Sequence, residues 1–121
     1  MEPNEQKKTE LNQKTLIENI QEMDSKENFL LNKENIILSI LSCLQDKIFP
    51  IPNKLIIIRY LEKCLTKIPF NLDLLLSQKL NNKNLYHIII YQFIINYDEK
   101  EYYDELKNLF SILLKNTSYT A

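Results

Sequence analysis

Residues 68–81 read IPFNLDLLLSQKLN and bring a helix stop, a helix start and a turn close together. The residue before Pro69 is disfavoured in the α conformation, so a helical pattern that starts at Pro52 should end just before it. Asn71 can cap a short new helix, and the leucines after it fall on one helical face. Residues 79–84 are polar and hold three Asn, which predicts a turn. These signals predict short helices joined by short connections.

Apolar residues upstream of this stretch recur every three or four positions, which indicates two further amphipathic helices. The first covers residues 16–23 and the second covers residues 36–44. We expect Asn32 to cap the second helix, with Glu34 in its first turn favouring the helix dipole. Pro52 suits the first turn of the next helix, where a missing N–H costs nothing.

Residues 85–97 are apolar at nearly every position, which leaves two interpretations. Isoleucine and aromatic residues favour strands, so a hairpin is the competing one. A run of this length without turn residues is more typical of one central buried helix, which we prefer. Residues 102–114 show helical spacing again. The sequence thus predicts an all-α fold, a compact bundle of five or six short helices.

The chain has 121 residues, a length that suits one domain with tails. Residues 1–12 are polar and charged and are expected to form a disordered N-terminal tail. We assign residues 13–116 to one helical domain and expect residues 117–121 to fray. The N-terminus lacks the apolar run of a signal peptide, and no apolar stretch is long enough to span a membrane.

The charge of the chain is nearly balanced, with 15 basic and 16 acidic residues, which gives no overall attraction to nucleic acid. Several tyrosines offer stacking surfaces, but a nucleic-acid site normally interleaves them with arginine, and Arg59 is the single arginine. We therefore expect neither a membrane partner nor direct nucleic-acid binding. Cys43 and Cys64 lie in different helical patterns without metal-ligand spacing and are expected to be free, buried thiols.

The sequence shows no pattern typical of a catalytic or metal site. His87 is the only histidine and lies in an apolar run, where a partly buried, hydrogen-bonded role is expected. The acidic residues between positions 99 and 105 suit the start of a helix. A chain without glycine cannot form a phosphate-binding glycine loop. We therefore expect no enzymatic activity, no cofactor and no metal.

The stretch of residues 68–81 resembles the central motif of the TFIIS N-terminal domain family. In that family the motif runs Leu-Pro, a variable residue, Thr, then Leu-Asp with an apolar pair, and it closes with Ile-Gly. Asn in place of that Gly suits a left-handed turn. The resemblance covers about residues 28–115 and implies that the helical domain is a docking domain. The residues that carry the match are Ile68-Pro69, Asn71, Leu72-Asp73 and Leu80-Asn81.

Within the family, the pattern is most similar to the core domain of the Iws/Spn transcription elongation factors. Those proteins carry Trp-Leu in one helix and Ile-Arg in the next, for which this chain has Cys43-Leu44 and Ile58-Arg59. The chain departs from the family in lacking its Gly, its Trp and a Trp-Ser-Arg-like end. The resemblance implies a nuclear, non-enzymatic interaction module of transcription elongation. Its implied partners are a short acidic, Phe-containing peptide of an Spt-six-like histone chaperone and the RNA polymerase II elongation complex.

The resemblance also implies a peptide pocket between the loop before the second helix and the turn before the fifth. The residue types in these two connections also suit a peptide pocket. Leucines lie there among polar residues, and the lysines beside them would attract an acidic partner. The leucines could equally fasten helix ends to the core. The implied partner-binding residues are Leu30, Leu31, Asn32, Lys33, Lys79, Leu80, Asn81, Lys83 and Tyr86.

Two other functions stay open. A helical regulator unrelated to transcription would bind a partner helix in a long apolar groove between helices. A bundle that binds nucleic acid would do so with a steep dependence on salt.

Overall fold

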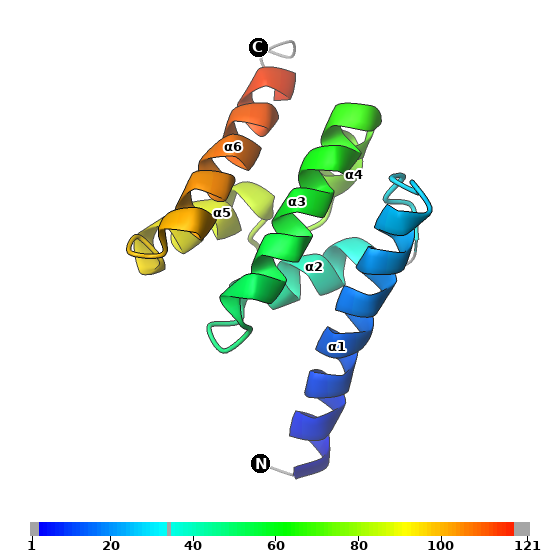
Figure 1. Ribbon diagram of the computed structural model, residues 1–121, viewed down its shortest axis with the longest axis vertical. Helices are drawn as coiled ribbons and strands as arrows, with labels where there is room; N and C mark the ends of the chain where they lie inside the picture. Colours follow the sequence, from blue (N-terminus) through cyan, green and yellow to red (C-terminus); the bar gives the residue numbers. More distant parts are fainter. Residues whose placement is uncertain (1–2, 34, 118–121) are drawn as a thin grey trace.

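The computed structural model describes residues 3–33 and 35–117, with only the backbone for residues 3–12 and 117. This part of the chain forms six α-helices and no strand, which confirms the predicted all-α bundle (Figure 1). The helices are α1 Pro3–Ser25, α2 Ile36–Gln45, α3 Ile51–Lys67, α4 Asn71–Ser77, α5 Leu85–Ile95 and α6 Lys100–Thr117.

Helix α3 is the central element of the bundle. It lies between α1 and α6, and it also packs on α2 and α4 (Figure 1). Ile57, Ile58 and Leu61 have no exposed surface, because neighbours cover α3 on several sides. Helix α5 packs on α2 and α6 and so reaches the core from one side only. Burying these apolar faces is the main favourable term in the stability of such a bundle.

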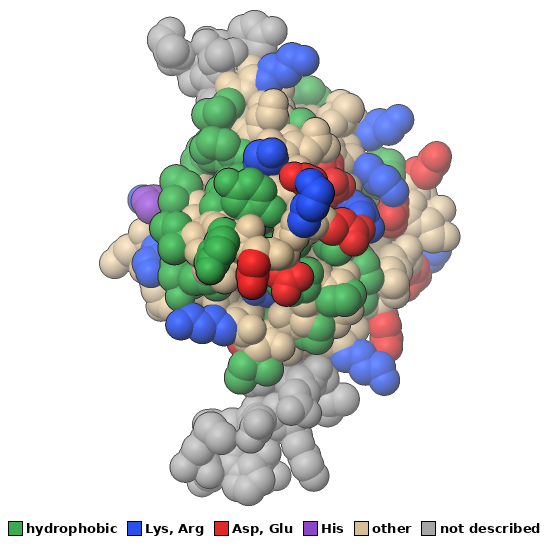
Figure 2. Space-filling view, turned by 60° about the vertical axis from the view of Figure 1, so that its left-hand side comes forward, with side chains coloured by type: hydrophobic (Ala, Val, Ile, Leu, Met, Phe, Trp, Pro, Cys, Tyr) green, Lys and Arg blue, Asp and Glu red, His purple; other side chains and the backbone are tan. Residues whose placement is uncertain are grey.

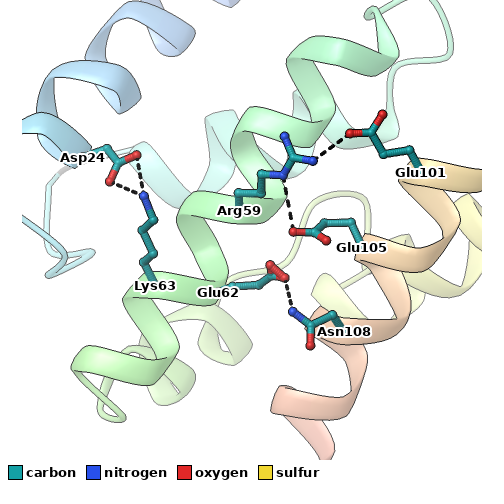
Figure 3. Close-up of polar contacts among 7 residues, drawn as sticks. All are labelled: Asp24, Arg59, Glu62, Lys63, Glu101, Glu105 and Asn108. Carbon is teal, nitrogen blue, oxygen red and sulfur yellow. Dashed lines mark hydrogen bonds and ion pairs between the residues drawn. The ribbon is translucent and has the colours of Figure 1, made fainter.

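Ion pairs connect α3 to the helices on either side of it. Figure 3 shows Lys63 reaching Asp24 on α1, with 2.9 Å between Nζ and Oδ1. On the other side, Arg59 contacts Glu101 at 2.8 Å and Glu105 at 3.4 Å, both on α6. The Arg59 and Lys63 side chains are half exposed, so each pair contributes little, about 0–1 kcal/mol.

The prolines and the asparagine turn act as the sequence predicts. Pro52 occupies the first turn of α3, and the helix ends before Pro69. Asn81 and Asn82 have φ values of 54° and 66°, in the left-handed region that asparagine tolerates. The apolar run after this turn forms the helix α5, so the hairpin interpretation is wrong.

Two expectations near the N-terminus need correction. Helix α1 begins at Pro3, so residues 3–12 continue the helix where a disordered tail was expected; their Glu, Gln and Lys residues are good helix formers. Asn32 does not cap α2, because that helix begins later, after Asn35 with a left-handed φ of 65°. The expected role of Glu34 lies outside the described residues. At the other end, α6 ends at Thr117, and the expected fraying of residues 118–121 lies outside them too.

The sequence predicts Asn71 as the N-cap of α4, but the structure places it inside the helix, buried and hydrogen-bonded to other segments. Its side-chain Oδ1 accepts the backbone N–H of Leu31 at 2.9 Å. Its Nδ2 donates to the carbonyls of Phe29, at 2.7 Å, and Cys64, at 2.9 Å. The preceding Phe70 takes the N-cap position without a side-chain hydrogen bond. One amide therefore ties α4 to the end of α3 and to the loop before α2.

Candidate protein-interaction surface

Helix α5 leaves one apolar face open to solvent. Ile90 is 48% exposed and Ile94 66% exposed, and Tyr91 lies beside them. These residues border a groove of about 540 Å³. The end of α2, the loop after α2 and the turn before α5 also line it. We call it the α5 groove; it is lined by Gln45, Lys47, Lys83, His87, Ile88, Ile90, Tyr91 and Ile94.

Figure 2 shows part of the surface around this groove. Hydrophobic side chains gather on the side of the molecule where the histidine, coloured purple, lies, and Lys or Arg side chains stand next to them. Exposed apolar residues that stand alone are normal on proteins, but a contiguous apolar hollow marks an interaction site.

Only the opposite face of α5 packs against the bundle, and this leaves the face with Ile90 and Ile94 exposed. Leu85, Ile88, Ile89 and Gln92 are buried against the bundle. A helix that is apolar on every side needs neighbours on every side, and α5 packs mainly on α2 and α6. The expectation of a central buried helix is therefore only half right, because the outward isoleucines stay exposed.

A capping box fixes the start of α5 and the position of its histidine. The Asn84 side chain accepts the backbone N–H groups of Tyr86, at 3.0 Å, and His87, at 3.4 Å. In return, the Asn84 backbone N–H donates to Nδ1 of His87 at 3.2 Å. His87 is thus hydrogen-bonded, as predicted, but exposed rather than partly buried. It holds the first turn in place and faces the groove with the rest of its ring.

The charged groups that line the α5 groove are all basic. Lys47 comes from the loop after α2 and Lys83 from the turn before α5. Neither lysine forms an ion pair with any residue that the structure describes. The Lys47 ammonium lies 6.0 Å from the centre of the Tyr91 ring, at the outer limit of a cation–π contact. The groove therefore joins apolar walls to uncompensated positive charge.

A buried polar cluster lies on the inner face of the same helix. Oε1 of Gln92 accepts hydrogen bonds from Lys54 at 3.0 Å, Asn96 at 3.0 Å and Tyr102 at 3.1 Å. Lys54 is only 1% exposed, and burial lowers the pKa of its ammonium group. The cluster fixes α5 against α3 and α6 and contains no carboxylate.

The residues expected to bind a peptide do not come together in one place. Leu31, Asn32 and Lys33 line a second cavity, of about 340 Å³, together with Leu74 and Gln78 of the α4 region. Leu31 itself is buried, with 2% of its surface exposed, and Leu30 is half-buried.

The other expected residues do not join that cavity. Lys83 lines the α5 groove instead. Tyr86 packs on Phe110 of α6, with ring centres 6.1 Å apart. Leu80 is half-buried against the core, which agrees with the fastening role, while Lys79 and Asn81 are exposed.

Hydrophobic spacing in the sequence does not predict that Lys47, Ile90, Tyr91 and Ile94 share an open surface. A signal for them was present, because residues 85–95 are apolar on all sides in a chain too short to surround every helix. The face that would stay open depends on which helices pack against α5, and periodicity does not give that.

The cysteines carry no chemistry at the surface. Cys43 and Cys64 are free and buried, as predicted, and burial raises their pKa values to about 11 and about 12. Protonated, covered thiols are poor nucleophiles. In the described part of the chain no group of His, Cys, Asp or Glu is arranged to hold a metal ion. Among the same residues, no helix is both long and apolar enough to cross a membrane.

Comparisons of the chain with models of protein families, with curated proteins and with solved structures found no match.

Proposed function

We propose that this protein is a non-enzymatic protein–protein interaction module that binds a partner segment in the α5 groove. The observation that carries the proposal is the exposed apolar face of Ile90, Tyr91 and Ile94 beside a 540 Å³ hollow. Recognition of an amphipathic segment by an apolar groove is a common mode of peptide binding. This is the helical-regulator function that the sequence leaves open.

The exposed isoleucines contribute little to the fold itself. Ile94 keeps about two thirds of its surface in water, at 66% exposure, so covering it by a partner would gain free energy that folding leaves unused. A face that folding does not need and that still carries Ile, Ile and Tyr is best explained by contact with another molecule.

A second candidate is docking in transcription elongation, by analogy with the TFIIS N-terminal domain family. It is favoured by the left-handed Asn81, at the position where that family has Gly. It is also favoured by the cavity at Leu31 and Lys33, at the end of the bundle where the resemblance puts a peptide. In this version the protein is nuclear and binds an acidic, Phe-containing peptide of an Spt-six-like protein. This candidate rests on the resemblance.

Selection of a displayed library of random linear peptides on the full chain tests the first proposal. We expect enriched peptides that bind the wild type and lose at least about tenfold in affinity on Ile94→Glu, since a charge would then enter the apolar contact. Phe70→Glu is the matched control, because Phe70 is 60% exposed on another part of the surface. Enriched peptides that bind Ile94→Glu as well as the wild type would overturn the α5 groove as the binding site.

A titration of isotope-labelled protein separates the two candidates. The probe is a synthetic acidic peptide with one Phe. Shifts at Leu31, Asn32 and Lys33 would favour the elongation candidate, whereas shifts at Ile90 and Ile94 would favour the α5 groove. A peptide that moves neither set at millimolar concentration would remove the elongation candidate.

A further inference from the structure

We infer that the occupant of the α5 groove is an acidic amphipathic helix of a partner protein. This inference rests on the proposed function, because it names the chemistry of the partner for the same groove. The exposed apolar face of α5 indicates that the partner is a helix. The lysines of the groove indicate that this helix is acidic.

The spacing of the groove residues on α5 suits a helical partner. His87, Ile90, Tyr91 and Ile94 lie at positions i, i+3, i+4 and i+7, which form one continuous stripe along a helix. Side chains at this spacing form ridges along a helix, with grooves between the ridges. A second helix packs against the first by placing its own ridges into these grooves. The eleven residues of α5 extend about 16 Å, at 1.5 Å per residue, which matches roughly three turns of a partner helix.

The charges at the groove favour an acidic partner. Lys47 and Lys83 both line it, from the loop after α2 and from the turn before α5, and no carboxylate of a described residue lines it with them. The nearest acidic neighbour in the sequence, Asp46, does not line the groove; its carboxylate accepts Nε2 of Gln13 at 2.7 Å and the backbone N–H of Ile48 at 2.9 Å. Acidic residues flanking the apolar stripe of a partner would meet free ammonium groups, whereas basic residues would be repelled.

Gln45 marks a polar contact in the groove. Its Oε1 is buried and lacks a hydrogen-bond partner among the described residues, although the side chain lines the groove. A buried polar atom without a partner is uncommon in folded proteins. A hydrogen-bond donor on the partner helix would satisfy it, which adds specificity to the apolar contact.

The test uses a displayed library of helical peptides with apolar residues fixed at i, i+3, i+4 and i+7. The flanking positions vary between Glu and Lys, and selection is done on the full chain. We expect enrichment of Glu at the flanks on the wild type. On the double variant Lys47→Glu, Lys83→Glu we expect enrichment of Lys instead. The preference of a selected acidic peptide over its Lys twin should be about fivefold at low salt and should shrink at high salt.

The outcomes separate this inference from the proposed function. Selected helices with no Glu preference, all lost on Ile94→Glu, would overturn the acidic partner and leave the groove as a docking site. No enrichment on the wild type over Ile94→Glu would overturn both. A wild-type dimer that Ile94→Glu dissociates in sedimentation equilibrium would assign the groove to a second copy of the chain, and would also overturn the acidic partner.

Discussion

The side chain of Asn71 accepts the backbone N–H of Leu31 at 2.9 Å, across forty positions of sequence. Both residues are buried, and the same amide donates to the carbonyls of Phe29 and Cys64. The described part of the loop before α2 contains neither helix nor strand, and this amide pairs with two of its backbone groups, the N–H of Leu31 and the carbonyl of Phe29. The loop that lines the second cavity is thus held by Asn71 of α4 together with Tyr60 of α3, whose hydroxyl donates to the Asn28 carbonyl at 2.6 Å.

Replacing Asn71 by Ala should strongly destabilise the protein. The change leaves the buried N–H of Leu31 without its partner and removes the donor from the Phe29 carbonyl, and a buried group left unpaired costs about 1–3 kcal/mol. The Cys64 carbonyl still accepts the backbone N–H of Ile68 at 2.9 Å. We expect the free energy of unfolding, measured in urea, to fall by about 2–4 kcal/mol. A loss below about 1 kcal/mol would show that water replaces the amide and that the loop is not fastened by it.

A pair of Asn→Ala variants tests where the true helix cap lies. Asn84 caps α5 with its side chain, so Asn84→Ala should lower the free energy of unfolding by about 1 kcal/mol. Asn32 is exposed and caps no helix, so Asn32→Ala should change it by less than about 0.5 kcal/mol. Thermal or urea unfolding of both variants measures the difference. Equal losses would contradict the structure and restore Asn32 as a cap.

Local signals explain the parts of the fold that the sequence predicts. Pro52 and Pro69 set the ends of α3 through the backbone of adjacent residues, and Asn81 adopts the left-handed turn that a chain without glycine needs. None of these features depends on which helices meet in space. For the same reason the sequence predicts the helical state of α5 correctly but not which of its faces is buried.

Long-range partners explain what the sequence does not predict. The sequence around Asn71 predicts a helix cap, because Asn71 precedes a short run of leucines. Its hydrogen-bond partners Leu31 and Phe29, however, lie in the distant loop before α2. The candidate surface differs for a related reason: Lys83 is close in sequence to Lys79 but lines a groove with Lys47. Such pairings follow from the packing of α5 on α2, which hydrophobic spacing leaves undetermined.

Stability should depend on pH through Glu62, at the contact of α3 with α6. Burial, and then the neighbouring carboxylate of Glu105, raise the pKa of Glu62 to about 7, although Asn108 donates a 2.6 Å hydrogen bond to it (Figure 3). The folded protein therefore binds a proton that the unfolded chain, with the ordinary value of 4.5, releases. The stability that this proton gives is full below pH 4.5 and is lost as the pH rises through about 7.

The variant Glu62→Gln measures that contribution. We expect it to be more stable than the wild type above pH 7, with the difference shrinking towards pH 4.5, because an amide has no charge to desolvate. Urea unfolding across this pH range gives the difference in the free energy of unfolding between the two proteins. The contributions of the other titrating groups cancel in this difference. Glu18→Gln, at an exposed position of α1, is the control and should keep the wild-type pH dependence. A constant difference between Glu62→Gln and the wild type at all pH values would contradict the raised pKa.

Lys54 should make the opposite contribution to the pH dependence. Its ammonium group is buried with Gln92, and burial lowers its pKa below 10.5 although the charge of the Asp46 carboxylate acts in the opposite direction. Between the lowered pKa and 10.5 the unfolded chain binds the extra proton, so this contribution to stability rises with pH over that interval. Lys54→Met should remove the rise. It should also cost little, or stabilise the protein, because Gln92 keeps its donors Asn96 and Tyr102.

Urea unfolding of Lys54→Met and of the wild type at rising alkaline pH checks this prediction as a difference between the two proteins. Lys79→Met is the matched control, since Lys79 is exposed and the same change there should leave the pH dependence as it is. A loss of several kcal/mol in Lys54→Met at neutral pH would mean that the ammonium group supports the cluster around Gln92 more than its burial costs. In that case the folded protein would favour the charged lysine, and the stability of the wild type relative to Lys54→Met would fall with rising alkaline pH, which is the opposite of the predicted rise.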